Sequence, residues 1–362
     1  MAHGGHCVAR LPESLPEVGG TVVFVRHALP GEQVTVEVTE GGVGDRFLRA
    51  DTVAVHRAAA DRVVPPCPFA GPGRCGGCDL QHVSVDAQLR WKADVVAEQL
   101  RRLAGLDRPV VVERVAGDVD GLAWRTRMRF HRLPDGAVGL RAHRSHRVVP
   151  VDACLIQAPR AQVVVEGEPA PSGPVVERVG QHVFGVPPDG FWQVHRGAPE
   201  ALVHAVLEGA ATRPGDRVLD LYSGVGLFTA FLAEQVGPEG RVLAVEGHRE
   251  AAAHAERNLA AYAWVGSVCG PVERVLEALP EEDRHPDVVV LDPPRDGARR
   301  EVVEAVAGLG PRTVVHVACD PAAFARDVAL FGERGYVLGS VRAFDLFPMT
   351  QHVEVVGVLG RR

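Results

Sequence analysis

The chain has 362 residues, more than the ~250–300 that a single hydrophobic core usually serves, so we expect two or three domains. Its hydrophobic content of 46% is ordinary for a globular protein, and no apolar run approaches the ~18 residues of a membrane span. The net charge of −7 gives no support by itself for a nucleic-acid partner, and the opening residues lack the apolar core of a signal peptide. We therefore expect a cytoplasmic protein without a membrane partner, whose seven cysteines are metal ligands, catalytic thiols or core residues rather than disulfides.

Short β-type runs fill the first segment of the chain, at residues 21–25, 34–38 and 51–55. Glycine and proline turn signals separate them. Strands of this length and spacing predict a small barrel of the oligonucleotide-binding (OB) type, with a generic β-module as the alternative.

Three cysteines follow within twelve residues, namely Cys67, Cys75 and Cys78, and Cys154 lies further along. The two glycines between Cys75 and Cys78 let the backbone turn so that both sulfurs face one centre. Four thiolates suit either a zinc ion or an iron–sulfur cluster, and the spacing does not separate the two. Unrelated buried cysteines and a thioredoxin-like redox pair are the less favoured alternatives. A helix is expected next, over residues 84–103.

Residues 121–150 carry seven arginines and a single acidic residue, Asp135. Arg125, Arg127 and Arg129 alternate with other residues, which would place all three on one face of a strand. This face is either a solvated sheet surface or a phosphate-binding surface, depending on what the neighbouring domains do.

From about residue 187 the pattern changes to alternating strands and helices, which predicts a doubly wound, Rossmann-like parallel sheet. Strands are expected at residues 217–221, 241–245, 287–291, 313–318 and 353–359, and helices at 227–236 and 249–262. Gly224 and Gly226 form a turn after the first of these strands, and Glu246 ends the second, where it can accept hydrogen bonds from ribose hydroxyls. This combination indicates an adenosine-containing cofactor, either NAD or S-adenosylmethionine.

A run of β-branched residues ends at Cys319, and Asp320-Pro321 stops the strand there. Cys319 therefore lies at the carboxyl end of a strand, which is the edge where open α/β sheets bind ligands. The alternative is a cysteine that acts as a small buried hydrophobe.

Seven motifs taken together resemble the S-adenosylmethionine-dependent RNA 5-methyluridine methyltransferases, and they occur in that family's order. They are CPFAGPGRCGGC, FWQV, DLYSGVGLF, AVEG, LDPPRDG, VACDPAAFARD and FPMTQHVEVV. The first segment resembles the TRAM domain that many members carry. The resemblance covers essentially the whole chain and implies three domains: a TRAM barrel at 1–58, a central cysteine-bearing, β-rich domain at 59–186, and a catalytic domain at 187–362. Either the TRAM barrel is missing its first strand, or the true start of the protein lies upstream of the given one.

The resemblance also implies roles for individual residues. Cys319 would be the nucleophile that adds to carbon 6 of uracil, and Glu354 the base that removes the proton from carbon 5. The positions that correspond to cofactor contacts are Gln193, Tyr222, Glu246 and Asp292, beside the turn glycines Gly224 and Gly226. Cys67, Cys75, Cys78 and Cys154 would hold a [4Fe-4S] cluster, with zinc as second choice.

The partner implied is RNA, with 23S ribosomal RNA favoured over transfer RNA, and the protein is expected to be a monomer. The target uridine must be flipped out or lie in a loop, which favours the phosphate-binding interpretation of the arginines. Two alternatives are kept: an RNA cytosine-C5 methyltransferase, and a non-catalytic RNA-binding protein with a methyltransferase fold.

This chain departs from the family pattern in several places. Seven residues separate Cys67 from Cys75 where five are usual, and Leu227 replaces an asparagine of the glycine turn. Residues 267–271 lack the acidic or amide side chain expected at the adenine edge. Arg295 stands where the DPPY motif of amino-group methyltransferases has tyrosine, which argues against chemistry on an exocyclic amine. No residue next to Cys319 in the sequence identifies the group that would lower its pKa.

Overall fold

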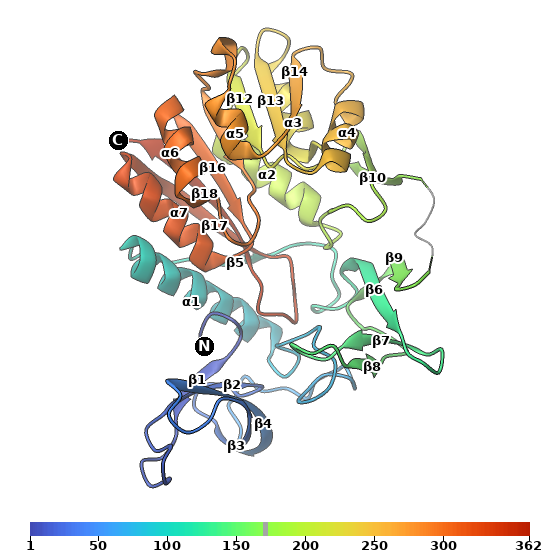
Figure 1. Cartoon of the computed structure of the whole chain (residues 1–362), viewed down its shortest axis with the longest axis vertical. Helices are drawn as coiled ribbons and strands as arrows, with labels where there is room; N and C mark the ends of the chain where they lie inside the picture. The colour runs from blue at the N-terminus through green and yellow to red at the C-terminus, as the bar shows by residue number, and fades with distance from the viewer. Residues whose placement is uncertain (169–172) are drawn as a thin grey trace. The chain divides into compact units, whose positions relative to one another are not determined.

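The computed structural model describes residues 1–168 and 173–362 (Figure 1). The chain divides into two compact units. The first unit comprises Met1–Val95, Gly117–Glu168 and Phe347–His352, and the second comprises Val96–Ala116, Pro169–Leu346 and Val353–Arg362. No helix in the described part of the chain is long and apolar enough to cross a membrane. The three-domain division remains a prediction.

A four-stranded sheet opens the first unit, with the strand order β1-β2-β4-β3. Its strands are β1 (Cys7–Arg10), β2 (Val22–Arg26), β3 (Gln33–Glu40) and β4 (Phe47–Arg57). Val23 and Val25 alternate along β2 and pack on Leu48 and Ala50 of β4, so the alternating pattern correctly predicted these strands. β1 was not predicted, because only Cys7 of its four residues is buried and the strand carries no alternating signal.

A second four-stranded sheet follows in the first unit, in the order β8-β7-β6-β9. Its strands are β6 (Arg125–Arg132), β7 (Val138–Arg141), β8 (Val148–Pro150) and β9 (Gln157–Val165). Met128, Phe130 and Val151 form its small core, and Cys75 and Cys154 pack against that core. Helix α1 (Val85–Ala104) precedes this sheet, within a residue of the predicted bounds.

The second unit is built on an eight-stranded sheet with the order β14-β13-β12-β15-β16-β18-β17-β5. Its strands are β5 (Val112–Arg114), β12 (Arg217–Leu221), β13 (Arg241–Glu246), β14 (Val265–Cys269), β15 (Val288–Leu291), β16 (Thr313–Ala318), β17 (Tyr336–Asp345) and β18 (Glu354–Arg361). The five strands from β14 to β16 are parallel, and β18 runs antiparallel to β16. β10 (Val175–Val179) and β11 (His182–Val186) form a separate hairpin.

Helices cover both faces of this sheet, as the doubly wound prediction required (Figure 1). α2 packs on α3, and α6 packs between α5 and α7. The helices are α2 (Ala198–Ala210), α3 (Leu227–Val236), α4 (Arg249–Asn258), α5 (Val272–Glu277), α6 (Arg299–Leu309) and α7 (Pro321–Glu333), with a short 3₁₀ turn at Glu281–Asp283. The α/β fold class is confirmed. The predicted helix over 249–262 was too long, since α4 ends at Asn258.

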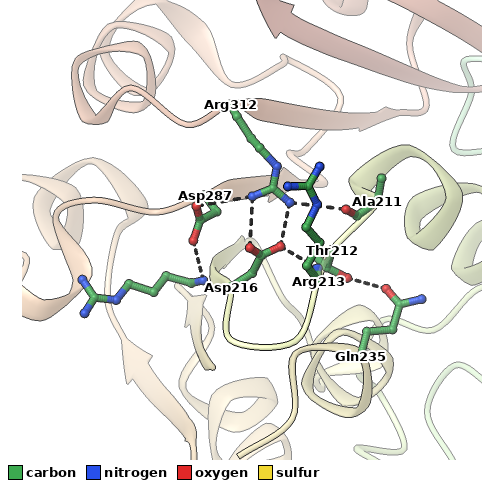
Figure 2. Close-up of polar contacts among 8 residues, drawn as sticks. Ala211, Thr212, Arg213, Asp216, Gln235, Asp287 and Arg312 are labelled. Atoms are coloured by element: carbon green, nitrogen blue, oxygen red, sulfur yellow. Dashed lines mark hydrogen bonds and ion pairs between the residues drawn. The ribbon is translucent and has the colours of Figure 1, made fainter. Parts of the chain in front are cut away.

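A cluster of ion pairs ties the amino ends of three parallel strands together (Figure 2). Arg312, just before β16, contacts Asp216 before β12 at 2.6 and 3.2 Å and Asp287 before β15 at 3.3 Å. Asp287 also accepts a hydrogen bond from the backbone N–H of Arg217 at 2.9 Å. These contacts lie at the edge opposite the carboxyl ends of the strands, so they hold the register of β12, β15 and β16 without occupying the edge where ligands bind.

Candidate active site

The register of the parallel strands brings three predicted cofactor residues to one edge of the sheet. Leu221 at the end of β12 lies opposite Val245 of β13 and Leu291 of β15. The residues that follow these three, Tyr222, Glu246 and Asp292, therefore leave the sheet side by side. In the sheet, β13 lies on one side of β12 and β15 lies on the other, so the strand order reverses next to β12. Doubly wound sheets bind their ligands at such a reversal.

The turn after β12 has a left-handed backbone at three positions, with φ of 62° at Tyr222, 57° at Gly224 and 91° at Gly226. A side chain on Gly226 would meet Leu259 at 2.9 Å, so this glycine is needed for packing. A Cβ on Gly224 would meet nothing within 4 Å. The turn therefore exposes backbone to open space at Gly224, where a ligand can approach it closely.

Glu246 is held by the glycine turn. Its carboxylate accepts hydrogen bonds from the backbone N–H of Gly224 at 2.8 Å and of His248 at 2.6 Å. Each carboxylate oxygen has a second lone pair, so the group can also accept from the hydroxyls of a ribose. This fixed orientation fits the role predicted for it from the sequence.

Two polar side chains under the turn were missed by the sequence analysis. Asp220 is fully buried; its Oδ2 accepts a hydrogen bond from Thr229, while its Oδ1 has no partner among the described residues. Burial, with a contribution from Glu246, raises the pKa of Asp220 to about 7. Ser223 also has a buried hydroxyl without a described partner. Both lie inside the motif DLYSGVGLF, and unpaired buried groups of this kind are expected where a ligand completes the hydrogen bonding.

Cys319 and Glu354 are brought together by the pairing of β16 with β18. Ala318 lies opposite Val355 in this antiparallel pair, so Cys319 and Glu354 occupy the next position along it. Glu354 is only 3% exposed and Cys319 is half-buried. Asp320 caps α7 by accepting from the N–H of Ala323 at 2.8 Å, which places Cys319 directly before the positive end of that helix.

The charges around Cys319 oppose ionisation of its thiol. Burial, together with the carboxyls of Glu354 and Asp292, raises the pKa of Cys319 to about 12, and Arg295 acts in the opposite sense. The pKa of Glu354 is itself raised well above its usual range by burial and by Asp292, again against Arg295. The groups that favour the thiolate are thus Arg295 and the amino end of α7. Arg295 was considered in the sequence only as a missing tyrosine, and its charge was not recognised as part of the site.

Gln193 is buried in the segment between β11 and α2. The hydrogen bonds recorded for the described residues include none between Gln193 and the glycine turn or Glu246. Its cofactor contact remains a prediction.

The four predicted cluster cysteines line one cavity of about 300 Å³ in the first unit, which we call the cysteine cavity. Burial raises the pKa of Cys75, Cys78 and Cys154, that of Cys78 to about 12. The neighbouring thiol of Cys67 also raises the pKa of all three. The charge of Arg125 acts on Cys78 and Cys154 in the opposite sense. Within the described ranges, no three His, Cys, Asp or Glu side chains are placed to hold a single metal ion. Whether the four thiols hold a cluster or a metal ion remains a prediction.

A second cavity of about 270 Å³ in the first unit, the arginine cavity, has a strongly basic lining. Five arginines line it against two acidic residues, Glu40 and Asp51; they are Arg26, Arg49, Arg74, Arg144 and Arg147. Arg144 has a left-handed backbone with φ of 46°, an unusual conformation for a residue with a side chain. The sequence predicted Arg125, Arg127 and Arg129 on one face of a strand. Of these, Arg125 and Arg129 line the cysteine cavity and not the arginine cavity.

Comparison with known proteins identifies the class and then the family. The family model described as the TRAM domain matches residues 2–53, and the one described as protein-L-isoaspartate(D-aspartate) O-methyltransferase matches residues 196–269. The solved tRNA (uracil-54, C5)-methyltransferase of Pyrococcus abyssi, in complex with S-adenosyl-L-homocysteine, is 21% identical and shares the fold with a TM-score of 0.71, over 98% of this chain and 99% of that one. This chain thus has the fold of that methyltransferase.

Curated RNA methyltransferases match the chain from end to end. One from Streptomyces avermitilis is 43% identical and covers 99% of this chain and 96% of its own. Another from Bifidobacterium longum is 39% identical, covering 99% and 95%. The chain belongs to the TRAM-domain family of RNA methyltransferases, as the sequence motifs predicted.

The first prediction concerns the carboxyl beside Cys319. Replacing Glu354 by glutamine removes a charge that raises the pKa of Cys319, so alkylation of this thiol by iodoacetamide at pH 9 should become about threefold faster or more. Arg295→Gln should slow the same reaction. Mass spectrometry of the peptide that contains Cys319 measures both rates, and equal rates in the two variants would contradict the assignment of these charges.

The second prediction concerns Asp220, whose folded-state pKa of about 7 lies above the usual value of 3.8. The folded protein then holds this proton more tightly than the unfolded chain, so wild-type stability falls as the pH rises from about 4 to about 7 and stays lower above that. Asp220→Asn has no carboxyl to ionise at this position, so it should not show this fall in stability. Its free energy of unfolding at pH 8 should exceed that of wild type by about 1 kcal/mol or more, with little difference at pH 4.

Thermal unfolding at the two pH values, without cofactor, measures this effect. Asp216→Asn is the contrasting control, because it takes away a partner of Arg312 and should lower the melting temperature at pH 8. An Asp220→Asn protein that is less stable than wild type at pH 8 would show that the carboxylate is favoured in the fold. The same variant should bind S-adenosylmethionine more weakly.

Proposed function

We propose that this protein methylates carbon 5 of a uridine in RNA with S-adenosylmethionine as the methyl donor. The observation that supports the proposal is the position of Cys319 and Glu354 directly after the Ala318–Val355 pair of β16 and β18, where the charge of Glu354 acts on the Cys319 thiol. Both residues lie on the edge of the sheet that also carries the glycine turn and Glu246. A nucleophile and a base beside a methyl-donor site are the groups that this reaction requires.

Carbon 5 of uracil is a poor nucleophile, and Cys319 overcomes this by covalent addition. The thiolate forms a bond to carbon 6, and the electrons of the 5,6 double bond move toward carbon 5 and the carbonyl at carbon 4. S-adenosylmethionine, when bound, supplies the methyl group as an electrophile for carbon 5. Glu354 then takes the remaining proton from carbon 5, the double bond re-forms, and the bond from sulfur to carbon 6 breaks to return the thiolate.

The raised pKa of Glu354 supports this role. A carboxylate whose pKa is raised is a stronger base than an ordinary one, which suits removal of a proton from carbon. The same burial keeps Cys319 protonated in the free protein. Arg295, whose charge favours both the thiolate of Cys319 and the carboxylate of Glu354, would hold the two anions that the reaction cycle needs.

The substrate RNA is proposed to be 23S ribosomal RNA in preference to transfer RNA. The TRAM domain and the cysteine cavity are the features that favour a large structured RNA, while the Pyrococcus abyssi relative acts on a transfer RNA. Phosphates of either RNA would find a complementary surface in the arginine cavity. Mapping 5-methyluridine in both RNAs of a deletion strain distinguishes them.

We also propose that Cys67, Cys75, Cys78 and Cys154 hold a [4Fe-4S] cluster. The volume of the cysteine cavity, which all four thiols line, supports a polynuclear group over a single zinc ion. Such a cluster would fasten the Cys67–Cys78 segment to the sheet formed by β6–β9. No step of the methyl transfer requires it.

The reaction is tested with radiolabelled S-adenosylmethionine and two transcripts, one without cytidine and one without uridine. The uridine transcript should be methylated, and Cys319→Ala should lower the rate by about 10³-fold or more because the covalent step is lost. Glu354→Gln should still add to the base and accept the methyl group, so a methylated adduct of protein and RNA should accumulate on a denaturing gel.

Methylation of the cytidine transcript alone would show a cytosine-C5 enzyme. Unchanged methylation by Cys319→Ala would rule out the covalent mechanism.

The cluster is tested on protein purified without oxygen. The preparation should be brown, with broad visible absorbance and equal amounts of iron and acid-labile sulfide. Cys78→Ser should lose both, whereas Cys269→Ser should keep them, because Cys269 is an exposed residue of β14 in the other unit. A colourless protein that contains zinc would contradict the proposal.

A further inference from the structure

A buried histidine and a buried aspartate lie on the elements that flank Cys319, and the proposed reaction uses neither of them. His316 on β16 is fully buried, and Asp327 on α7 is 2% exposed. Nε2 of the imidazole lies 2.9 Å from Oδ2 of Asp327, and the other ring nitrogen donates to the backbone carbonyl of Val317 at 2.9 Å. We call these two side chains the His–Asp pair. Because β16 ends directly before Cys319 and α7 begins two residues after it, the pair lies on the same strand and helix that hold the thiol.

Asp327 also holds the loop that leads into α6. Its Oδ2 accepts a hydrogen bond from the backbone N–H of Ala298 at 2.7 Å, and its Oδ1 accepts one from that of Arg299 at 3.3 Å. The loop packs closely on the carboxyl, because a Cβ added to Gly297 would come within 2.7 Å of Oδ2. Gly297 and Arg299 have a left-handed backbone, with φ of 86° and 65°. Such a conformation in a residue other than glycine persists only where the surroundings impose it, so the loop is held in one conformation.

The loop carries Arg295 on a tight turn. The turn spans residues 294–297 and is closed by a hydrogen bond from the N–H of Gly297 to the carbonyl of Pro294 at 2.8 Å, so Arg295 is one of its two central residues. Arg295 is exposed, and no hydrogen bond or ion pair of its guanidinium is recorded among the described residues. The position of this charge therefore depends on the backbone of the turn, whose closing residue and the residue after it both contact Asp327.

Arg295 is the side chain whose charge favours the thiolate of Cys319, against burial and two carboxyls. Asp327 can influence the thiol in two ways that differ in sign. A carboxyl is neutral or negative, so its direct effect on a neighbouring thiol can only oppose ionisation. Its effect through the loop favours ionisation, because it keeps a positive charge in place. An experiment that measures the sign of the effect therefore separates the two.

We infer that Asp327, oriented by His316, is a positioning residue for Cys319: it fixes the turn of residues 294–297 so that the charge of Arg295 acts on the thiol. The His–Asp pair thereby links the strand that ends at the nucleophile to the loop that carries its counter-charge. The consequence for methyl transfer rests on the proposed function, whereas the effect on the reactivity of the thiol does not.

Asp327→Asn tests this inference, because it keeps the size of the side chain and replaces one of the two acceptor oxygens by a donor. The measured quantity is the rate at which iodoacetamide alkylates Cys319 in the full-length protein at pH 9, followed by mass spectrometry. The variant should react about threefold more slowly than wild type, because Arg295 is no longer held in place. In an Arg295→Gln background the same change should alter the rate by less than about 1.5-fold, because two changes that act through one group do not add.

A role of Asp327 in stability alone leads to the opposite result. Loosening of the fold would expose the half-buried thiol and speed its alkylation, and so would the loss of a nearby negative charge. Faster or unchanged alkylation in Asp327→Asn would therefore overturn the inference, as would a slowing that multiplies with that of Arg295→Gln. Asp283→Asn is the matched control, because Asp283 is 3% exposed and pairs with Arg241 at 2.5 and 3.0 Å, at the amino end of β13. It should leave the rate unchanged.

His316→Phe is the second variant, and it keeps a flat ring in contact with Phe324. It removes the ring nitrogen that orients Asp327, so alkylation of Cys319 should again be slower, and again only where Arg295 is present. This variant decides the question if Asp327→Asn does not fold. Alkylation as fast as in wild type, or slowing that persists in the Arg295→Gln background, would then overturn the inference.

Methylation of RNA by the wild-type protein is measured in parallel to keep the two proposals separate. If the wild type forms 5-methyluridine and Asp327→Asn does not slow alkylation, the positioning role is wrong and the proposed function stands. If the wild type forms none while Asp327→Asn slows alkylation only where Arg295 is present, the positioning role stands and the reaction was assigned wrongly.

Discussion

Pairing register is the constraint on which the catalytic unit depends. Parallel pairing of β13, β12, β15 and β16 sends the residues after each strand to one edge, and antiparallel β18 returns Glu354 to that edge opposite Cys319. A shift of one residue in β18 would turn Glu354 to the other face of the sheet. The ion pairs of Arg312 at the opposite edge oppose such a shift among the parallel strands. The site is thus positioned by contacts that never touch a ligand.

Electrostatic conflict distinguishes this site from an ordinary reactive cysteine. Reactive thiols usually lie among positive groups, but Cys319 lies between two carboxyls with only Arg295 and a helix end to favour its anion. The proposed reaction would account for this conflict, because in it one residue adds to the base as an anion and another later accepts a proton. That reaction would need the two charges at different steps, so the carboxyl that raises the pKa of Cys319 would keep the thiol unreactive until a substrate is bound.

The sequence was a good guide wherever the function depends on the ends of regular elements. Strands rich in valine and a proline stop were enough to place Cys319, Glu246 and Asp292 at one sheet edge, and the doubly wound fold followed from the alternation of elements. The sequence did not predict features that depend on a buried polar atom without a hydrogen-bond partner, or on the charge of a residue from a different loop. The free oxygen of Asp220, the effect of Arg295 on Cys319 and the division of the arginines between two cavities each require three-dimensional contacts between distant residues.

The first unit shows the same limit more strongly. Cys67, Cys75, Cys78 and Cys154 were predicted as one set because thiols carry a distinctive spacing, and they do line one cavity. His27, Thr52, Gln81 and His82 have no such spacing and are individually unremarkable in the sequence. They line one cavity of about 230 Å³ together with Cys78, which lies three residues before Gln81 in the sequence. A group bound by the four thiols would therefore also hold Cys78 in the wall of this second cavity, a consequence that the spacing of the cysteines in the sequence does not show.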